Sequence, residues 1–230
     1  MKRIIFLFIF SLTITPIFSQ TQLYVDPEFS QIGSDHKIIA VIPFKTSISL
    51  RPKQMKELKD GDLERMEQNE SQDVQNSMYS WFLKRKQQGK LWVDIQEITL
   101  TNAILEENGI NYFNIDEYKP NDIAKILGVD ALIRGTFETN KPMSDGASLA
   151  LGLLVGYFGA TNKATINMFI HNGLDGKVLV NYHKGVAGSL GSSTDNLINI
   201  IMRKASRRIP YTKSDVKIQL YSKTSEGDEF

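Results

Sequence analysis

In the stretch Asp122-Ile-Ala-Lys-Ile-Leu-Gly-Val-Asp-Ala-Leu-Ile-Arg-Gly-Thr136, a helical pattern passes directly into a strand pattern. Pro120 suits the first turn of this helix, and Gly128 stands where a left-handed residue commonly ends a helix. The buried stripe of the helix is predicted to consist of Ile123, Ala124, Ile126 and Leu127. Asp130 to Glu138 follows at once as a predicted strand.

On the N-terminal side of this stretch, a strand, a charged helical region and a second strand are expected. Lys37 to Phe44 is an apolar run of strand length, rich in β-branched residues and closed by Pro43. The region from Pro52 to Gln88 is charged and helical, with Gly61 as a break. Leu91 to Ile98 alternates and predicts another strand. One apolar face of the helical region is formed by Val74, Met78, Trp81 and Phe82.

A short helix is expected after the second strand, capped by Thr99 or Thr101, running through Leu105 and closed by Asn108 and Gly109. Nearer the C-terminus, two further strands, 164–170 and 177–184, flank turn-forming dipeptides and predict a β-hairpin. The dipeptides are Asn172-Gly173 and Asp175-Gly176.

A final helix follows the hairpin. Its expected cap is Ser192, Ser193 or Thr194, and Pro210 ends it. Its core face consists of Leu197, Ile198, Ile201, Met202, Ala205 and Ile209. The basic residues Arg203, Lys204, Arg207 and Arg208 are open to two interpretations, a contact patch or cations that complement the helix dipole.

Helices that alternate with strands favour an α/β (α+β) fold. We expect a single compact domain over 37–211, in which helices cover a mixed sheet, with a C-terminal β-hairpin and helix. Residues 20–36 are expected as a polar, loop-like lead-in, and 212–230 as a partly disordered tail with one strand candidate, Val216 to Tyr221.

Three of these segments, in this order, resemble one bacterial envelope superfamily. They are Val41-Ile-Pro-Phe44, the stretch from Asp122 to Thr136, and Asp175-Gly-Lys-Val-Leu-Val180. The superfamily includes the periplasmic domain of the curli-secretion lipoprotein CsgG, the LpoB-type activators of cell-wall synthases and the amino-terminal domain of TolB. The resemblance implies a compact α/β fold that acts by binding and assembly, and it supplies no catalytic residues.

The first 19 residues predict a cleavable secretory signal peptide. Lys2 and Arg3 form a basic start, and an apolar run from Ile4 to Phe18 precedes Ser19. Cleavage after Ser19 is expected, because the run is shorter than the roughly 20 residues of a spanning helix. The chain has no cysteine, so it offers no acceptor for a lipid and no disulfide. The expected location is therefore the periplasm or the periplasmic face of the outer membrane, without lipidation.

The sequence shows no group of residues whose types and spacing predict catalysis. His36, His171 and His183 are dispersed, and without cysteine a thiolate zinc site is excluded. The adjacent acids Glu106 with Glu107, and Asp116 with Glu117, do not face each other on a helix and so cannot share a proton. The glycine-rich run 185–191 lacks the Lys-Ser/Thr ending of a phosphate loop. We therefore expect no catalytic residue, no metal, no cofactor and no small-molecule substrate, and thus no enzyme.

The uncharged segment 146–160, within an apolar, glycine-rich insertion over 143–161, is the best contact candidate in the sequence. It either packs on the sheet of its own domain or lies exposed and meets a partner or a membrane surface. In the second case the contact residues are Leu149, Leu151, Leu153, Leu154, Val155, Tyr157 and Phe158.

The sequence thus predicts a non-enzymatic exported interaction module that assists secretion or surface assembly by binding envelope proteins, with self-association also open. The alternative is a ring-forming, membrane-inserting secretion subunit like the curli channel. The formal net charge of +1, from 27 basic and 26 acidic residues, excludes a nucleic-acid partner.

Overall fold

The computed structural model describes residues 21–140, 163–187 and 193–212. The expected signal peptide, the contact segment from Leu149 to Phe158 and the tail strand Val216 to Tyr221 lie outside these residues.

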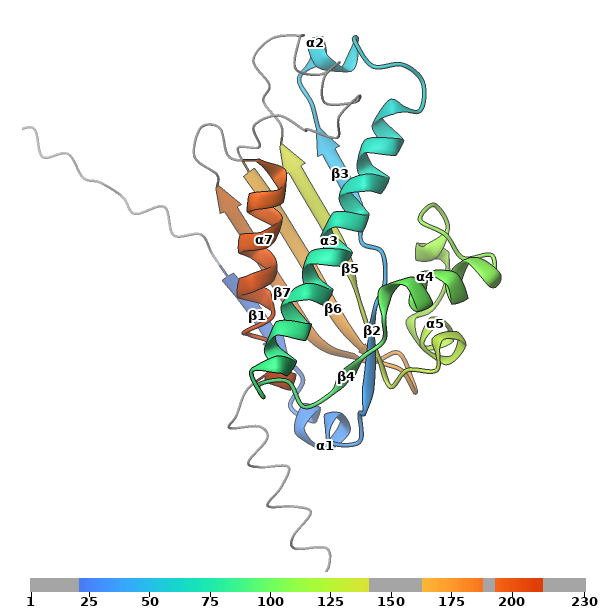
Figure 1. Cartoon of the computed structure of the whole chain (residues 1–230), viewed down its shortest axis with the longest axis vertical. Helices are drawn as coiled ribbons and strands as arrows, with labels where there is room; N and C mark the ends of the chain where they lie inside the picture. The colour runs from blue at the N-terminus through green and yellow to red at the C-terminus, as the bar shows by residue number, and fades with distance from the viewer. Residues whose placement is uncertain (1–20, 141–162, 188–192, 213–230) are drawn as a thin grey trace, which may run out of the picture.

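A mixed sheet forms the centre of the described chain (Figure 1). Its strands run in the order β1, β7, β6, β5, β2 and β4, and β3 also pairs with β5. Their bounds are Thr21–Val25 for β1, Ile38–Val41 for β2, Lys45–Ser49 for β3, Asp94–Ile95 for β4, Ala131–Asn140 for β5, Lys163–Asn172 for β6 and Val178–Ala187 for β7. β2 pairs in parallel with β4 and β5, and β6 pairs antiparallel with β5 and β7. The predicted α/β class and the hairpin are therefore confirmed.

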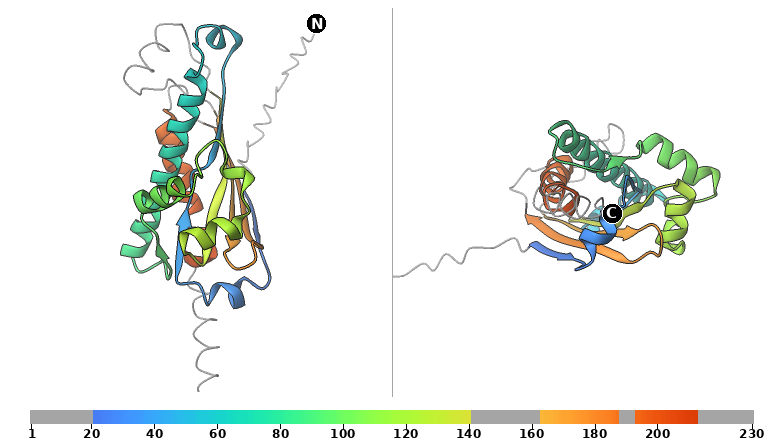
Figure 2. Two further views of the ribbon diagram at one scale, coloured as in Figure 1. Left: turned by 90° about the vertical axis from the view of Figure 1, so that its right-hand side faces the viewer. Right: turned by 90° about the horizontal axis from the view of Figure 1, so that it is seen from below.

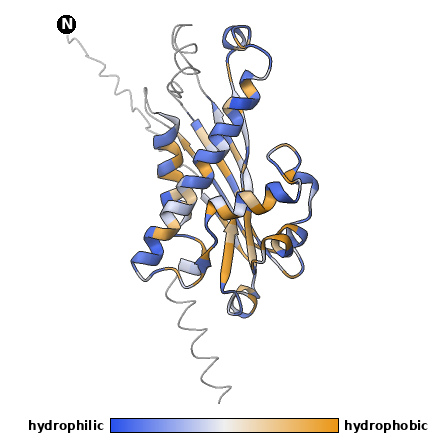
Figure 3. Cartoon of the chain, turned by 45° about the vertical axis from the view of Figure 1, so that its right-hand side comes forward, coloured by the Kyte–Doolittle hydropathy of each residue, from blue (hydrophilic) through white to orange (hydrophobic). Residues whose placement is uncertain are grey.

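The helices are α1 (Phe29–Gly33), α2 (Pro52–Met55), α3 (Asp62–Gln87), α4 (Ile98–Glu107), α5 (Pro120–Leu127) and α7 (Thr194–Ala205). Two short 3-10 turns lie at Ile115–Glu117 and Pro210–Thr212. α3 and α7 run side by side across one face of the sheet (Figures 1 and 2). Figure 3 shows α3 as mostly hydrophilic, with separate hydrophobic residues, as expected for a long helix that buries one stripe.

Two hydrophobic clusters hold these layers together. Successive side chains of β2 point to opposite faces of the sheet, so Ile39 and Val41 pack in the larger cluster. Val74, Met78 and Phe82 of α3 are fully buried in the same cluster. The intervening Ala40 and Ile42 enter a second cluster beneath α4 and α5. β2 is thus buried on both faces, which explains why its sequence is a continuous apolar run.

Several local expectations are confirmed in detail. Gly128 is left-handed, with φ of 68°, and its backbone N–H closes α5 on Ala124 and Lys125. Gly61 precedes α3 with φ of 80°. Ser193 caps α7, because its side chain accepts a hydrogen bond from the backbone N–H of Asn196.

Other expectations differ from the structure. The loop expected for 21–36 is absent, since this region contains β1 and α1. The strand expected from Leu91 to Ile98 shrinks to Asp94–Ile95, and α4 already begins at Ile98. Its cap is neither Thr99 nor Thr101 but Glu97, whose carboxylate accepts from the N–H of Leu100 at 2.9 Å. Thr101 is instead buried and donates its hydroxyl to Gln96.

Candidate functional site

A groove lies between α3 and α7. Its volume is about 610 Å³, and it is lined by Asp73, Ser77, Ser80, Trp81, Lys84, Asp195, Ile198 and Asn199. The first five come from α3 and the last three from α7, and we call this surface the α3/α7 groove. Along α3 the spacing of Asp73, Ser77, Ser80 and Lys84 follows the helical period, so they form one stripe.

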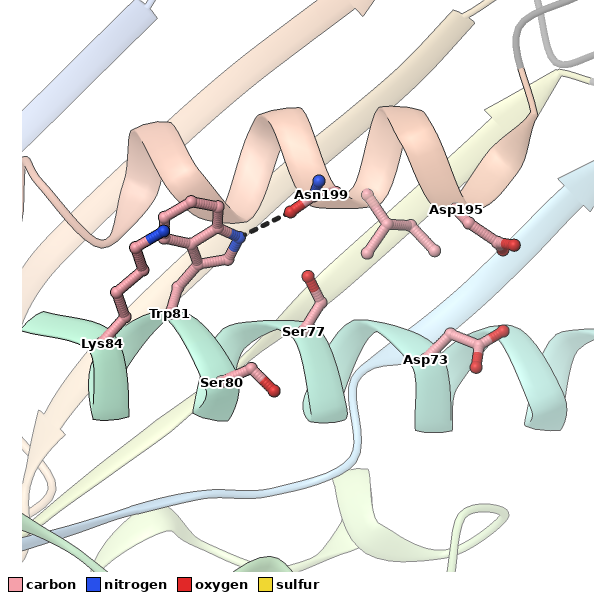
Figure 4. Close-up of a pocket in the computed structure, with 8 residues that line it drawn as sticks. Asp73, Ser77, Ser80, Trp81, Lys84, Asp195 and Asn199 are labelled. Carbon is pink, nitrogen blue, oxygen red and sulfur yellow. Dashed lines mark hydrogen bonds between the residues drawn. The ribbon is translucent and has the colours of Figure 1, made fainter.

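Trp81 is the largest side chain of the groove and is held in a fixed orientation. Its Nε1–H donates to Oδ1 of Asn199 on α7 at 2.7 Å. The ammonium of Lys84 lies 4.8 Å from the centre of the indole ring, a cation–π contact. The indole is half-buried against the larger hydrophobic cluster, so its remaining surface faces the groove (Figure 4).

The groove has an acidic end and a basic end (Figure 4). Asp73 and Asp195 stand at one end, where α7 begins, and both are exposed. Lys84 stands at the other end, beside Trp81. The small side chains of Ser77 and Ser80 lie between these ends and leave the central part open. Such a surface suits a polypeptide segment with charges of opposite sign at its two ends.

A second hollow of about 910 Å³ lies beside α5 and the β6–β7 turn. His36 is buried beneath it, with Nδ1 at 2.5 Å from the Tyr211 hydroxyl and Nε2 at 3.2 Å from Oδ1 of Asn172. The amide nitrogen of Asn172 donates to Asp175, which leaves Oδ1 to accept from His36. Nε2 of His36 thus donates to Asn172, and burial, which lowers the pKa of His36, favours the neutral ring that accepts from the Tyr211 hydroxyl at Nδ1.

The three histidines do not converge. His171 and His183 are half-buried residues of β6 and β7, and His183 pairs with Asn167, four positions before His171 on β6. Burial lowers the pKa of His36 and that of His171. Within the described ranges, no group of three His, Asp or Glu side chains is placed to hold a metal ion.

The four residues of the two adjacent acidic pairs are all exposed. Glu106 and Glu107 are exposed at the end of α4. Asp116 forms an ion pair with Arg134 of β5. The glycine-rich run begins inside β7, since Gly185 still pairs with Thr165 of β6. In the part of the chain that the structure describes, no helix is both long and apolar enough to cross a bilayer.

The sequence pattern predicted Trp81 as part of the apolar face of its helix and gave no sign that it lines a groove. The structure shows that Trp81 lies at the edge of this face, where it contacts α7. Its partner Asn199 lies 118 residues further along the chain, so no local pattern could have joined the two.

No protein-family model matches the chain, and a comparison with curated proteins finds no match. Solved structures with a similar arrangement do exist. The lipoprotein GNA1162 from Neisseria meningitidis is 13% identical with a TM-score of 0.41, over 75% of this chain and 96% of that one. The PelC dodecamer from Paraburkholderia phytofirmans is 10% identical with a TM-score of 0.40, over 81% of this chain and 93% of that one.

The C-terminal domain of LpoB from Salmonella enterica is 9% identical with a TM-score of 0.32, over 66% of this chain and 84% of that domain. Similarity at this level does not identify a shared function, because one fold serves many functions.

Proposed function

We propose that this chain is an exported, non-enzymatic protein of the bacterial cell envelope that binds another envelope protein through the α3/α7 groove and so assists secretion or surface assembly. The signal-peptide pattern of the first 19 residues supports export, and the three motif segments support membership of an envelope interaction superfamily. The groove supplies a surface for the interaction.

The observation that carries this proposal is the partly exposed and oriented ring of Trp81 in the groove. Tryptophan is enriched among the few residues that dominate protein interfaces, because it offers a large area with little conformational freedom to lose. Here the ring is oriented in advance by its hydrogen bond to Asn199 and its contact with Lys84. A partner that covers the indole would therefore gain apolar contact without ordering the side chain.

The charges of the groove define the orientation of the partner segment. A bound segment would place basic residues near Asp73 and Asp195, and acidic residues near Lys84. α7 begins at the acidic end of the groove, so a partner helix that runs antiparallel to α7 would end there. Basic residues are favourable in the last turn of a helix, so such a partner satisfies both the groove charges and its own dipole.

Site-specific cross-linking in intact cells tests the proposal. A photo-reactive residue at Ser80, which lines the groove, is compared with one at Gln72, which is exposed on α3 outside the groove. We expect a discrete envelope protein to be captured from position 80 only, identified by mass spectrometry. Equal capture from both positions, or none from position 80, would refute the groove as the binding surface.

Export is tested on the same material. Fractionation and amino-terminal sequencing should find a periplasmic or outer-membrane form that begins near Gln20. A mature protein that retains Met1 would contradict export by a cleaved signal.

A further inference from the structure

Positive charge is concentrated at one end of the molecule, although the whole chain has a formal net charge of only +1. Residues 74–93 contain Lys84, Arg85, Lys86 and Lys90 and no acidic residue, and of these four cations Lys86 forms an ion pair with Asp94 of β4. Residues 196–212 contain Arg203, Lys204, Arg207 and Arg208 and again no acidic residue. The two segments meet where α3 and α7 end, since Arg85 Nε donates to Ser206 Oγ at 3.4 Å. Figure 1 shows these two helix ends close together.

Arg85 is buried at this junction, with only 7% of its surface exposed. The side chains that bond to it, the Ser206 hydroxyl and the Gln88 amide oxygen, are neutral, and its guanidinium also lies 5.6 Å from the centre of the Trp81 ring, a cation–π contact. Burial of the guanidinium lowers the pKa of Arg85, and the charges of Arg207 and Arg203 lower it further. Among the residues that the structure describes, no carboxylate forms an ion pair with any of these three arginines.

The helix dipole explains only part of this charge. Arg85 and Arg203 lie in the last turns of α3 and α7, where a cation is favourable. Arg207 and Arg208 follow the end of α7 at Ala205, and the effect of the dipole falls off within the last turn. The positive charge at this end also reaches Lys184 on β7. Burial lowers the pKa of Lys184, and the charges of Lys204 and Arg208 lower it further.

We propose that Arg85, Arg203 and Arg207, the three-arginine cluster, bind the phosphate group of an anionic phospholipid headgroup at a membrane surface. A guanidinium presents its N–H donors in a fixed fork that matches phosphate oxygens. Arg203, in the last turn of α7, and Arg207, just after its end, are exposed. Both lie near enough to the buried Arg85 for their charges to lower its pKa, so the three guanidinium groups concentrate positive charge in one place.

A lipid surface fits this end of the molecule better than a single small ion. Exposed Lys90 and Arg208 and half-buried Lys204 extend the positive charge beyond the cluster. Each cation near an anionic bilayer adds to the attraction, so a spread of cations matches a surface that carries many phosphates.

The test uses the purified mature chain and co-sedimentation with two kinds of vesicle. One kind contains phosphatidylglycerol mixed with phosphatidylcholine, and the other contains phosphatidylcholine alone. The variant Arg203→Gln/Arg207→Gln removes two charges from the cluster. The control Lys53→Gln/Lys56→Gln removes two charges from exposed positions in and beside α2.

We expect the wild-type chain to bind the phosphatidylglycerol vesicles and not those of phosphatidylcholine alone. Arg203→Gln/Arg207→Gln should weaken this binding about tenfold or more, while the control changes it much less. Both variants should melt within a few degrees of wild type, because the replaced side chains are exposed.

Three results would overturn the proposal. The first is an equal loss of binding in both variants, which would indicate a general charge effect. The second is binding of inorganic phosphate without a preference for phosphatidylglycerol vesicles. The third is binding of an acidic peptide such as polyglutamate with no binding to either kind of vesicle.

Discussion

At the scale of single residues, two glycines near the start of β5 meet opposite constraints. Gly128 has a positive φ of 68°, and a Cβ added there would meet nothing within 4 Å. Gly135 has an ordinary backbone, but its Cβ would lie 2.1 Å from the carbonyl oxygen of Asn167 on β6. The first position is therefore restricted by conformation, and the second by the close approach of a neighbouring strand.

Alanine at the two positions should have different effects on the free energy of unfolding. Gly128→Ala should cost about 1 kcal/mol, because only the left-handed backbone disfavours a side chain. Gly135→Ala should cost more than about 2 kcal/mol, because β5 and β6 must separate to admit the methyl group. Urea unfolding of the purified domain measures both. Equal losses would contradict the distinction.

His36 connects three separated parts of the chain, since it bonds to Tyr211 and to Asn172 at the end of β6. A proton on Nδ1 would displace the hydrogen bond that the Tyr211 hydroxyl donates. Because burial lowers the folded-state pKa of His36, the unfolded chain takes up a proton first as pH falls. Stability is thus complete above the unfolded pKa of about 6.5 and decreases below it.

Acidification should therefore lower the melting temperature between pH 7.5 and 5.5, and His36→Gln should reduce this dependence. His171 has a pKa shift of the same sign, so part of the dependence should remain in the variant. His36→Gln should also melt lower than wild type at pH 7.5, since it disturbs a buried network. Melting curves across this range provide the measurement. An unchanged pH dependence in His36→Gln would show that His36 is not responsible.

At the scale of elements, β3 shows why parts of the sheet could not be predicted. Lys45–Ser49 is short and mostly polar, so its sequence does not resemble a strand. Its backbone N–H groups find partners far away, at the Tyr112 hydroxyl for Thr46 and at the Glu67 carboxylate for Ile48. Among the strands that the structure describes, β1 likewise pairs only with β7, more than 150 residues later. Such pairings become visible only in three dimensions.

The Tyr112 hydroxyl should stabilise β3 measurably. It lies 3.3 Å from the backbone nitrogen of Thr46 and 2.9 Å from its Oγ1, in a buried position. Tyr112→Phe should lower the free energy of unfolding by about 1–2 kcal/mol, because a buried N–H loses its acceptor. Tyr118→Phe is the matched control, since the Tyr118 hydroxyl has no hydrogen bond to another described residue. Equal effects of the two changes would contradict this role.

Two of the elements that the sequence did predict share one property. α5 and the β6–β7 hairpin are defined by contacts between near neighbours, namely the left-handed Gly128 after α5 and the glycine turn at Gly176. The cap of α4 was assigned wrongly because Glu97, Thr99 and Thr101 can all accept from a backbone N–H. Residue type alone does not choose among neighbouring acceptors.

At the scale of the whole molecule, the fold class followed from alternating helices and strands, but the candidate site did not. The α3/α7 groove exists only because α7, near the end of the chain, returns to lie beside α3. The contact predicted from sequence, Leu149 to Phe158, lies outside the described residues and stays a prediction. The groove lies between α3 and α7, and the three-arginine cluster lies where these two helices end, so the groove can serve a protein partner and the basic end a membrane.

The central claim is that the α3/α7 groove binds a protein of the envelope, and affinity capture with matched variants tests it most directly. Ser80→Arg places a long side chain into the groove, whereas Gln72→Arg adds the same charge at an exposed position of α3 outside it. Tagged forms of wild type and both variants are recovered from cross-linked envelopes, and the partner bands are quantified by mass spectrometry.

We expect Ser80→Arg to lose at least about tenfold of the captured partner, as is typical when an interface centre is blocked, while Gln72→Arg captures as much as wild type. Melting temperatures of both variants should stay within a few degrees of wild type, because both positions are exposed. Undiminished capture by a folded Ser80→Arg chain would contradict the account.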